Sequence, residues 1–241
     1  METRQEVVKS IGACLLVLLL SVVVLTYVPE QPSSLTQQAQ IQQAVPPQPT
    51  SHLSWLDSTL FFSHLQTRLP QYREGFEKAA QKHNIPWTLL AAQAYQESRW
   101  NRHAKSPTGV RGLMMLTRVT AASLGIQNRL DPDKSIAGGA AYFAQLLKRV
   151  SPSVQEPDRI WIALAAYNVG MRHIRDAQTL ARQFKKDPYR WKDLKTVLPL
   201  LAKKKYYTTL RYGYARGQEP VQYVTRIQSY WDLLYKRLSE V

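Results

Sequence analysis

The stretch Gln93–Asn101, QAYQESRWN, decides the fold of this chain and raises a chemical question, because one carboxylate stands in an apolar, amide-rich pattern. The surrounding apolar residues recur at helical spacing and predict a helix over Trp87–Ser98. On that helix Leu90, Ala94 and Glu97 share the face that points toward a core. Acidic side chains are rarely buried without a partner. Glu97 is therefore either one half of a structural ion pair or a group with a chemical role.

Two interpretations of Glu97 follow from its position at the end of this helix. Loss of water and the negative end of the helix dipole both raise the pKa of a carboxyl, which suits a general acid that works near neutral pH. Alternatively, Glu97 pairs with a nearby arginine and caps a loop, for which Arg99, Arg102 and Arg111 are the candidates. Spacing alone leaves both interpretations open.

The C-terminal part of the chain, residues 51–241, predicts one all-α domain. Its apolar residues recur at helical spacing, and alternating runs typical of strands are absent. Pro86, Ser135 and Pro157 are typical start signals for the segments that follow them. The expected helices are Leu53–Arg68, Gln71–His83, Trp87–Ser98, Thr117–Leu124, Ile136–Val150, Asp158–Asn168, Ile174–Phe184, Tyr189–Leu200 and Pro220–Leu238.

The N-terminal residues 1–29 predict a cytoplasmic stub and a transmembrane signal anchor. Ile11–Val28 is an uncharged, apolar run of about the length that crosses the hydrocarbon core of a membrane. No A-x-A-like site follows it, which favours an uncleaved anchor over the alternative, a cleaved signal peptide. Arg4 and Lys9 precede the run, so the positive-inside rule places the folded domain outside the cytoplasm.

Residues 30–50, EQPSSLTQQAQIQQAVPPQPT, predict a disordered linker between the anchor and the domain. The segment is rich in Gln, Pro and Ser and nearly free of aromatic and charged side chains. Such a composition buries too little apolar surface to offset the entropy of ordering the chain. The linker is expected to act as a tether, extended where the prolines cluster.

The composition narrows the kinds of partner and site. Lys and Arg number 32 against 17 Asp and Glu, and the net charge of +15 favours an anionic partner. The single cysteine, Cys14, excludes an intramolecular disulfide and a cysteine zinc site, and the five histidines lack metal-ligand spacing. Leu201–Arg216 is basic and rich in tyrosine, as in nucleic-acid binders, but an export signal precedes it, so nucleic acid is not expected as a partner.

Two further segments bear on the site. Ser106–Leu116, SPTGVRGLMML, places Pro107, Gly109 and Gly112 close together, which is typical of a sharp turn or of backbone that approaches a ligand. Ala163–Gly170, ALAAYNVG, places Tyr167 and Asn168 at a helix end. Taken alone, a tyrosine in this position is more often a core aromatic with a bonded hydroxyl than a catalytic group.

Together the motifs QESRWN, SPTGVRGLMML and AAYNVG resemble the catalytic domain of the soluble lytic transglycosylases, glycoside hydrolase family 23. The resemblance covers about Gln71 to Tyr235 and implies a goose-lysozyme-like helical fold. The C-terminal stretch YYTTLRYGYARGQEPVQYVTRI is similar to the membrane-bound F branch of this family, including Glu219 and Tyr223 four residues apart on one helix.

The resemblance implies a role for each matching residue. Glu97 would be the catalytic acid and base, and Ser106 would line the cleft near the acetamido group of the substrate. The tyrosine that matches Tyr167 directs its hydroxyl toward the catalytic glutamate. The other residues expected to bind substrate are Gly112, Leu113, Met114, Met115, Asn168, Glu219 and Tyr223.

The sequence departs from the family at two points. Gln usually follows Gly-Leu-Met, whereas this chain has Met115, which is expected to contact the sugar ring or the core through apolar atoms. Members of the F branch carry a solute-binding-like module before the catalytic domain, and here the linker of residues 30–50 stands in its place.

The resemblance implies an enzyme that cleaves the MurNAc–GlcNAc β-1,4 bonds of peptidoglycan glycan strands, without water and without a metal or other cofactor, and leaves 1,6-anhydromuramoyl ends. A single acid suffices if the substrate supplies the nucleophile, whereas ordinary glycosidases use two carboxylates. The aspartates Asp57, Asp131, Asp133, Asp158 and Asp176 are expected at helix caps or in solvent, not as the second carboxylate.

Two alternatives remain beside the transglycosylase: a muramidase of the same fold that uses water, and a non-enzymatic peptidoglycan-binding module. The intact Glu97 motif favours an enzyme over the binding module. The expected location is the inner membrane, crossed once by the anchor, with the catalytic domain in the periplasm; association with the outer membrane is the alternative. The sequence identifies no protein partner.

Overall fold

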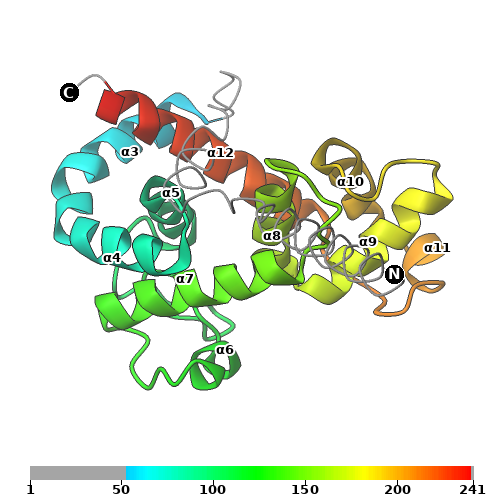
Figure 1. Ribbon diagram of the computed structural model, residues 1–241, viewed down its shortest axis with the longest axis horizontal. Helices are drawn as coiled ribbons and strands as arrows, with labels where there is room; N and C mark the ends of the chain where they lie inside the picture. The colour runs from blue at the N-terminus through cyan, green and yellow to red at the C-terminus, as the bar shows by residue number, and fades with distance from the viewer. Residues whose placement is uncertain (1–52, 240–241) are drawn as a thin grey trace, which may run out of the picture. The chain divides into compact units, whose positions relative to one another are not determined.

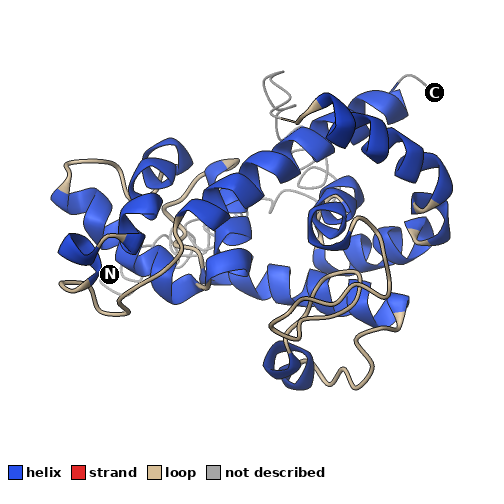
Figure 2. Cartoon of the chain, turned by 180° about the vertical axis from the view of Figure 1, so that it is seen from behind, coloured by secondary structure: helices blue, strands red, loops and turns tan. Residues whose placement is uncertain are grey.

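The computed structural model describes residues 53–239, and every regular element in that range is a helix (Figures 1 and 2). The prediction of an all-α domain is therefore confirmed for these residues. Isolated β-bridges join Lys105 to Arg111 and Arg111 to Leu116 within one loop. The helices are α3 (Trp55–Thr67), α4 (Arg73–His83), α5 (Trp87–Ser98), α6 (Arg118–Ser123), α7 (Pro132–Arg149), α8 (Asp158–Val169), α9 (Met171–Gln183), α10 (Trp191–Val197), α11 (Lys204–Tyr207) and α12 (Gln218–Ser239), with 3₁₀ turns η1 (Leu69–Gln71) and η2 (Leu198–Ala202).

The helix that carries Glu97 has the predicted bounds, whereas α7 begins earlier than predicted. Ile136 was expected to open that helix, but α7 begins at Pro132. The Asp131 side chain accepts a hydrogen bond from the backbone N–H of Lys134, which makes Asp131 the N-cap. Proline at the first helical position is compatible with this cap, because its missing N–H would have no partner inside the helix.

The predicted helix Tyr189–Leu200 is shorter in the structure. It spans Trp191–Val197 as α10 and then tightens into the 3₁₀ turn η2, which contains Pro199. Proline has no N–H to continue the α-helical ladder, so the regular helix ends just before it. The short helix α11, Lys204–Tyr207, was not predicted.

Helix α5 lies at the centre of the packing. All seven residues from Leu89 to Tyr95 are buried, so the helix is enclosed on all sides there and not only along one stripe. It packs against α4 and α12, while α8 packs against α7, α9 and α12 (Figure 1). The alanines in the stretch let neighbouring helices approach its backbone closely. Glu97 therefore stands at the end of a helix that is enclosed over seven consecutive residues.

The chain reverses direction immediately after α5. Arg99 and Trp100 both have left-handed backbone conformations, with φ of 53° and 56°. Non-glycine residues adopt this region only at some cost, which the surrounding contacts must offset. The Trp100 indole N–H donates to the Ala91 carbonyl at 2.9 Å, and its ring lies 4.7 Å from that of Tyr95. The buried indole thus holds the reversal against α5.

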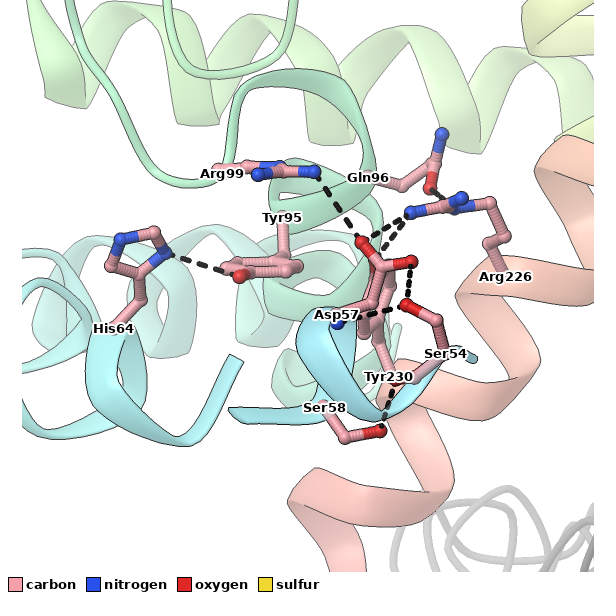
Figure 3. A network of polar contacts seen from close by, with 9 residues as sticks. All are labelled: Ser54, Asp57, Ser58, His64, Tyr95, Gln96, Arg99, Arg226 and Tyr230. Carbon is pink, nitrogen blue, oxygen red and sulfur yellow. Dashed lines mark hydrogen bonds and ion pairs between the residues drawn. The ribbon is translucent and has the colours of Figure 1, made fainter. Parts of the chain in front are cut away.

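A polar network fixes α3 to α5 and α12 (Figure 3). The carboxylate of Asp57 lies 3.2 Å from the guanidinium of Arg226 and 3.4 Å from that of Arg99. Arg226 also donates to the side-chain oxygen of Gln96 at 3.1 Å. Burial alone would raise the pKa of Asp57, but the Ser54 hydroxyl and the two arginines outweigh it and hold the pKa below its ordinary value. The network sets the register of α12 beside the last turn of α5.

The expectation that the aspartates occupy caps or solvent is only partly correct. Asp131 is a helix cap, as predicted. Asp176 is instead buried, and its carboxylate accepts the backbone N–H of Tyr212 at 2.9 Å. A buried carboxylate of this kind holds a loop, because a backbone donor replaces the water that it loses.

The predicted anchor and linker, residues 1–50, lie outside the described residues. In the part that the structure describes, no helix has the length and apolar character needed to span a membrane.

Candidate active site

The Glu97 carboxyl lies in the last turn of α5 and is half-buried. The Tyr223 hydroxyl donates to its Oε1 atom at 2.6 Å. Tyr223 is buried in the first turns of α12, so two helices far apart in the sequence form this contact. At 2.6 Å the bond lies at the short end of the range for hydrogen bonds between two oxygen atoms.

Burial raises the pKa of Glu97 from its ordinary value of 4.5 to about 8, and the hydrogen bond from Tyr223 opposes this rise only in part. The carboxyl therefore holds its proton at neutral pH, as a general acid must. The alternative, an ion pair with a neighbouring arginine, is wrong for the described residues. Arg99 pairs with Asp57, and neither Arg102 nor Arg111 forms an ion pair with Glu97.

Tyr167 lies near the carboxyl but bonds elsewhere. Its hydroxyl, which the family resemblance directs toward the glutamate, donates to the Met114 carbonyl at 2.9 Å. Burial raises the pKa of Tyr167 well above its ordinary value, and the charge of Glu97 raises it further. The hydroxyl that reaches Glu97 is that of Tyr223.

Three side-chain hydroxyls fix the loop that carries Gly112, Leu113 and Met114. The Ser98 hydroxyl, next to Glu97, donates to the Leu113 carbonyl at 2.9 Å. The buried Ser135 hydroxyl of α7 accepts a hydrogen bond from the Met114 N–H at 3.1 Å. The Tyr167 hydroxyl donates to the Met114 carbonyl. The side chains of Leu113 and Met114 are fully buried. These two residues shape the site through their backbone, because their side chains belong to the core.

Gly112 is required where the loop meets the segment before α7. Its φ is +83°, and a β-carbon at this position would lie 1.9 Å from the Arg129 carbonyl oxygen. The Arg129 guanidinium in turn donates to the Gly109 and Leu116 carbonyls at 2.9 and 2.8 Å. The backbone is thus packed too closely there for any side chain.

The remaining predicted site residues have diverse surroundings. Met115 is half-buried with a φ of 45°. The Ser106 hydroxyl bonds the Thr108 hydroxyl at 2.8 Å and accepts the Val110 N–H at 3.2 Å, so it stabilises its own turn. Asn168 is exposed at the end of α8, and Glu219 is exposed in an ion pair with Arg216 at 3.1 Å. Their expected contacts with substrate stay predictions.

Sequence reasoning missed one residue of the site. Gln93 is fully buried one turn before Glu97 on α5, and its amide donates to the Tyr223 oxygen at 3.3 Å. Its spacing of four residues from Glu97 was the available signal, but a glutamine at that spacing is not specific. Within residues 53–239, no three His, Cys, Asp or Glu side chains gather as metal ligands.

Comparison with known proteins defines the class. Residues 74–190 match the transglycosylase SLT domain family. The 70 kDa soluble lytic transglycosylase from Escherichia coli has a similar fold, with a TM-score of 0.52 over 87% of this chain and 31% of that chain, at 23% identity. The chain thus contains a domain of the transglycosylase SLT family. Tyr223 lies outside the matched span, although it contacts the central carboxyl.

Relatives with a higher sequence identity include proteins named membrane-bound lytic murein transglycosylase F. The protein of that name from Marinobacter nauticus is 53% identical over 76% of this chain and 37% of its own length. The one from Maricaulis maris is 55% identical over 75% of this chain and 40% of its own length. The chain therefore matches well under half the length of either relative.

Gly112→Ala is expected to destabilise the domain by several kcal/mol, since a β-carbon collides with backbone that cannot move away. Gly109→Ala is the matched control, because Gly109 has a φ of +82° but nothing within 4 Å of the added carbon. The control should cost only about 1 kcal/mol from backbone strain. Urea unfolding of both variants measures the difference, and equal losses would contradict the packing described for Gly112.

Proposed function

We propose that this domain is a peptidoglycan lytic transglycosylase, which cleaves the β-1,4 bond between MurNAc and GlcNAc and leaves a 1,6-anhydromuramoyl end. The observation that carries the proposal is the half-buried Glu97, which holds its proton at neutral pH and has a tyrosine hydroxyl as its partner. Among the described residues, no carboxylate forms a hydrogen bond with the Glu97 carboxyl, whose partner is the Tyr223 hydroxyl. Paired-carboxylate glycosidases place their two carboxyls about 5–9.5 Å apart. A lone acid instead suits a reaction in which the substrate supplies the nucleophile.

The proposed reaction has two steps on one carboxyl. Glu97 first gives its proton to the glycosidic oxygen, the bond from C1 to that oxygen breaks, and GlcNAc leaves with a free 4-hydroxyl. The acetamido oxygen of MurNAc bonds to C1 meanwhile. The Glu97 carboxylate then takes the proton of the MurNAc 6-hydroxyl, and that oxygen displaces the acetamido oxygen from C1. Glu97 regains its proton and no water is consumed.

The surroundings of Glu97 suit both steps. Burial keeps the proton on the carboxyl before the first step, as the raised pKa indicates. Once the proton has left, the Tyr223 hydroxyl at 2.6 Å donates to the carboxylate that forms. A hydrogen bond to a charged group contributes about 1.5–3 kcal/mol. Tyr223 thus stabilises the Glu97 carboxylate between the two steps, when Glu97 acts as a base.

The charge of the domain suits an anionic polymer. Between residues 171 and 217 the basic side chains far outnumber the acidic ones, and most of them are exposed. The lactyl groups and peptide stems of peptidoglycan carry carboxylates, so a basic surface attracts the strand. The predicted substrate contacts of Ser106, Met115, Asn168 and Glu219 belong to this proposal.

Glu97→Gln is expected to lower the release of muropeptides from purified sacculi by about 10²–10⁴-fold or more, because the amide cannot donate the proton. Mass spectrometry of the released muropeptides is the measurement. Glu77→Gln makes the same change on an exposed side chain paired with Arg73, so its activity should equal that of the wild type. Release of anhydromuropeptides by the Glu97→Gln variant at the wild-type rate would exclude Glu97 as the acid, and reducing ends from the wild type would indicate a muramidase instead.

The pH dependence follows from the raised pKa of Glu97. We expect kcat/KM to stay level up to neutral pH and to fall about tenfold per pH unit above about 8, as the acid loses its proton. Between pH 4.5 and about 8, the Glu97 carboxyl is protonated in the folded state but ionised in the unfolded chain. The stability of the folded state therefore falls as the pH rises through this window. Glu97→Gln should therefore melt near the wild type at pH 4.5 and above it at pH 9. A wild-type rate that still rises above pH 9 would contradict the assignment.

We propose that residues 1–29 attach the protein to the inner membrane and that the domain lies in the periplasm. The uncharged run Ile11–Val28 and the relatives named as membrane-bound support this localisation. The protein isolated from cells should begin at its first residues and sediment with inner membranes. Removal of residues 1–29 should leave the domain in the soluble fraction. A mature N-terminus that begins after Leu25 would instead show a cleaved signal peptide.

A further inference from the structure

The side chain of Gln93 has an unusual environment. It is fully buried in the middle of α5, and its Nε2 group donates to the Tyr223 hydroxyl oxygen at 3.3 Å. Its Oε1 atom has no hydrogen-bond partner among residues 53–239. A buried amide with one weak bond and one unpaired oxygen costs folding free energy, whereas an apolar side chain of the same shape would not. Stability alone therefore does not explain the amide.

The contact to Gln93 determines the direction of the next hydrogen bond. A phenol has one proton to donate and an oxygen that accepts. Because the Gln93 N–H points at the Tyr223 oxygen, the phenol proton is left for the Glu97 Oε1 atom at 2.6 Å. Without the amide donor, the phenol could equally accept a proton from the neutral Glu97 carboxyl. The three side chains thus form a chain that runs from Gln93 through Tyr223 to Glu97.

We propose that Gln93 is a positioning residue that commits the Tyr223 proton to the Glu97 carboxylate. The proposal rests on the transglycosylase function proposed above, since it concerns the acid and base of that reaction. Gln93 is buried and acts only through Tyr223. Hydrogen bonds in a chain polarise one another, so the amide makes the phenol a better donor when the carboxyl is charged.

This role has a consequence for the ionisation of the carboxyl. The titratable groups that face Glu97 are the phenols of Tyr223 on α12 and Tyr167 on α8. Burial raises the pKa of both phenols well above the ordinary value, so the basic limb of the rate profile reports Glu97. Loss of the Gln93 donor weakens the bond that favours the carboxylate, and the pKa of Glu97 then rises further.

The test uses two substitutions that remove the amide, Gln93→Met and Gln93→Leu, in the full chain. We expect kcat on sacculi to fall about 3- to 10-fold, the loss of one ordinary hydrogen bond, while KM changes by less than about twofold. The basic limb of the pH profile should move upward by about 0.5 pH unit. Both variants should melt at or above the wild-type temperature, because the unpaired oxygen is gone.

The matched control is Gln178→Met, which removes a half-buried glutamine whose amide donates to the Pro188 carbonyl at 3.2 Å. It should leave the pH profile unchanged. The Gln93 substitutions are repeated in a Tyr223→Phe background, where the phenol that links Gln93 to Glu97 is absent. There they should have no further effect on kcat or on the basic limb.

An unchanged basic limb in both Gln93 variants, whatever their kcat, overturns the proposal. An equal effect in the Tyr223→Phe background also overturns it, since the amide would then act through general packing. These outcomes are distinct from failure of the proposed function. If Glu97→Gln is inactive while Gln93→Met matches the wild type in every respect, only the role of Gln93 is excluded.

Discussion

The hydrogen bond from Tyr223 to Glu97 is the interaction on which the candidate site depends. It joins the end of α5 to the beginning of α12, residues that stand 126 positions apart. Such a short bond forms only if the two helices cross at one register. The ion pair of Arg226 with Asp57 and the hydrogen bond that Arg226 donates to Gln96 hold α12 in that register one turn further along (Figure 3). The chemistry of one carboxyl therefore depends on how α3, α5 and α12 pack.

The loop beside the carboxyl is held in a different way. Its backbone groups are bonded by hydroxyls from three helices, namely Ser98, Ser135 and Tyr167. Each hydroxyl replaces water at a buried backbone group, which would otherwise cost free energy. Because Leu113 and Met114 face the core, the loop cannot move without disturbing the packing. The loop that carries Gly112, Leu113 and Met114 is therefore held rigidly, because two of its side chains are part of the core packing.

The features that depend on short-range sequence patterns were predictable from the sequence. The bounds of α5 and the raised pKa of Glu97 followed from helical periodicity and from burial. The hydroxyl that bonds Glu97 could not be predicted in this way, because its position depends on where α12 crosses α5. The family resemblance placed Tyr167 toward the glutamate, whereas the structure gives that contact to Tyr223. Gln93 escaped notice because a buried amide and a surface amide look alike in a sequence.

The position of Tyr223 also has a consequence for how the protein matures. Helix α12 follows every other described helix in the chain, so it is synthesised after them. Until it emerges and docks, Glu97 has no phenol partner and the aromatic cluster around Tyr95 lacks Tyr230. A nascent or proteolytically shortened chain without this helix would lack the hydrogen bond to Glu97. The contact that completes the environment of Glu97 therefore forms only when the last helix has docked.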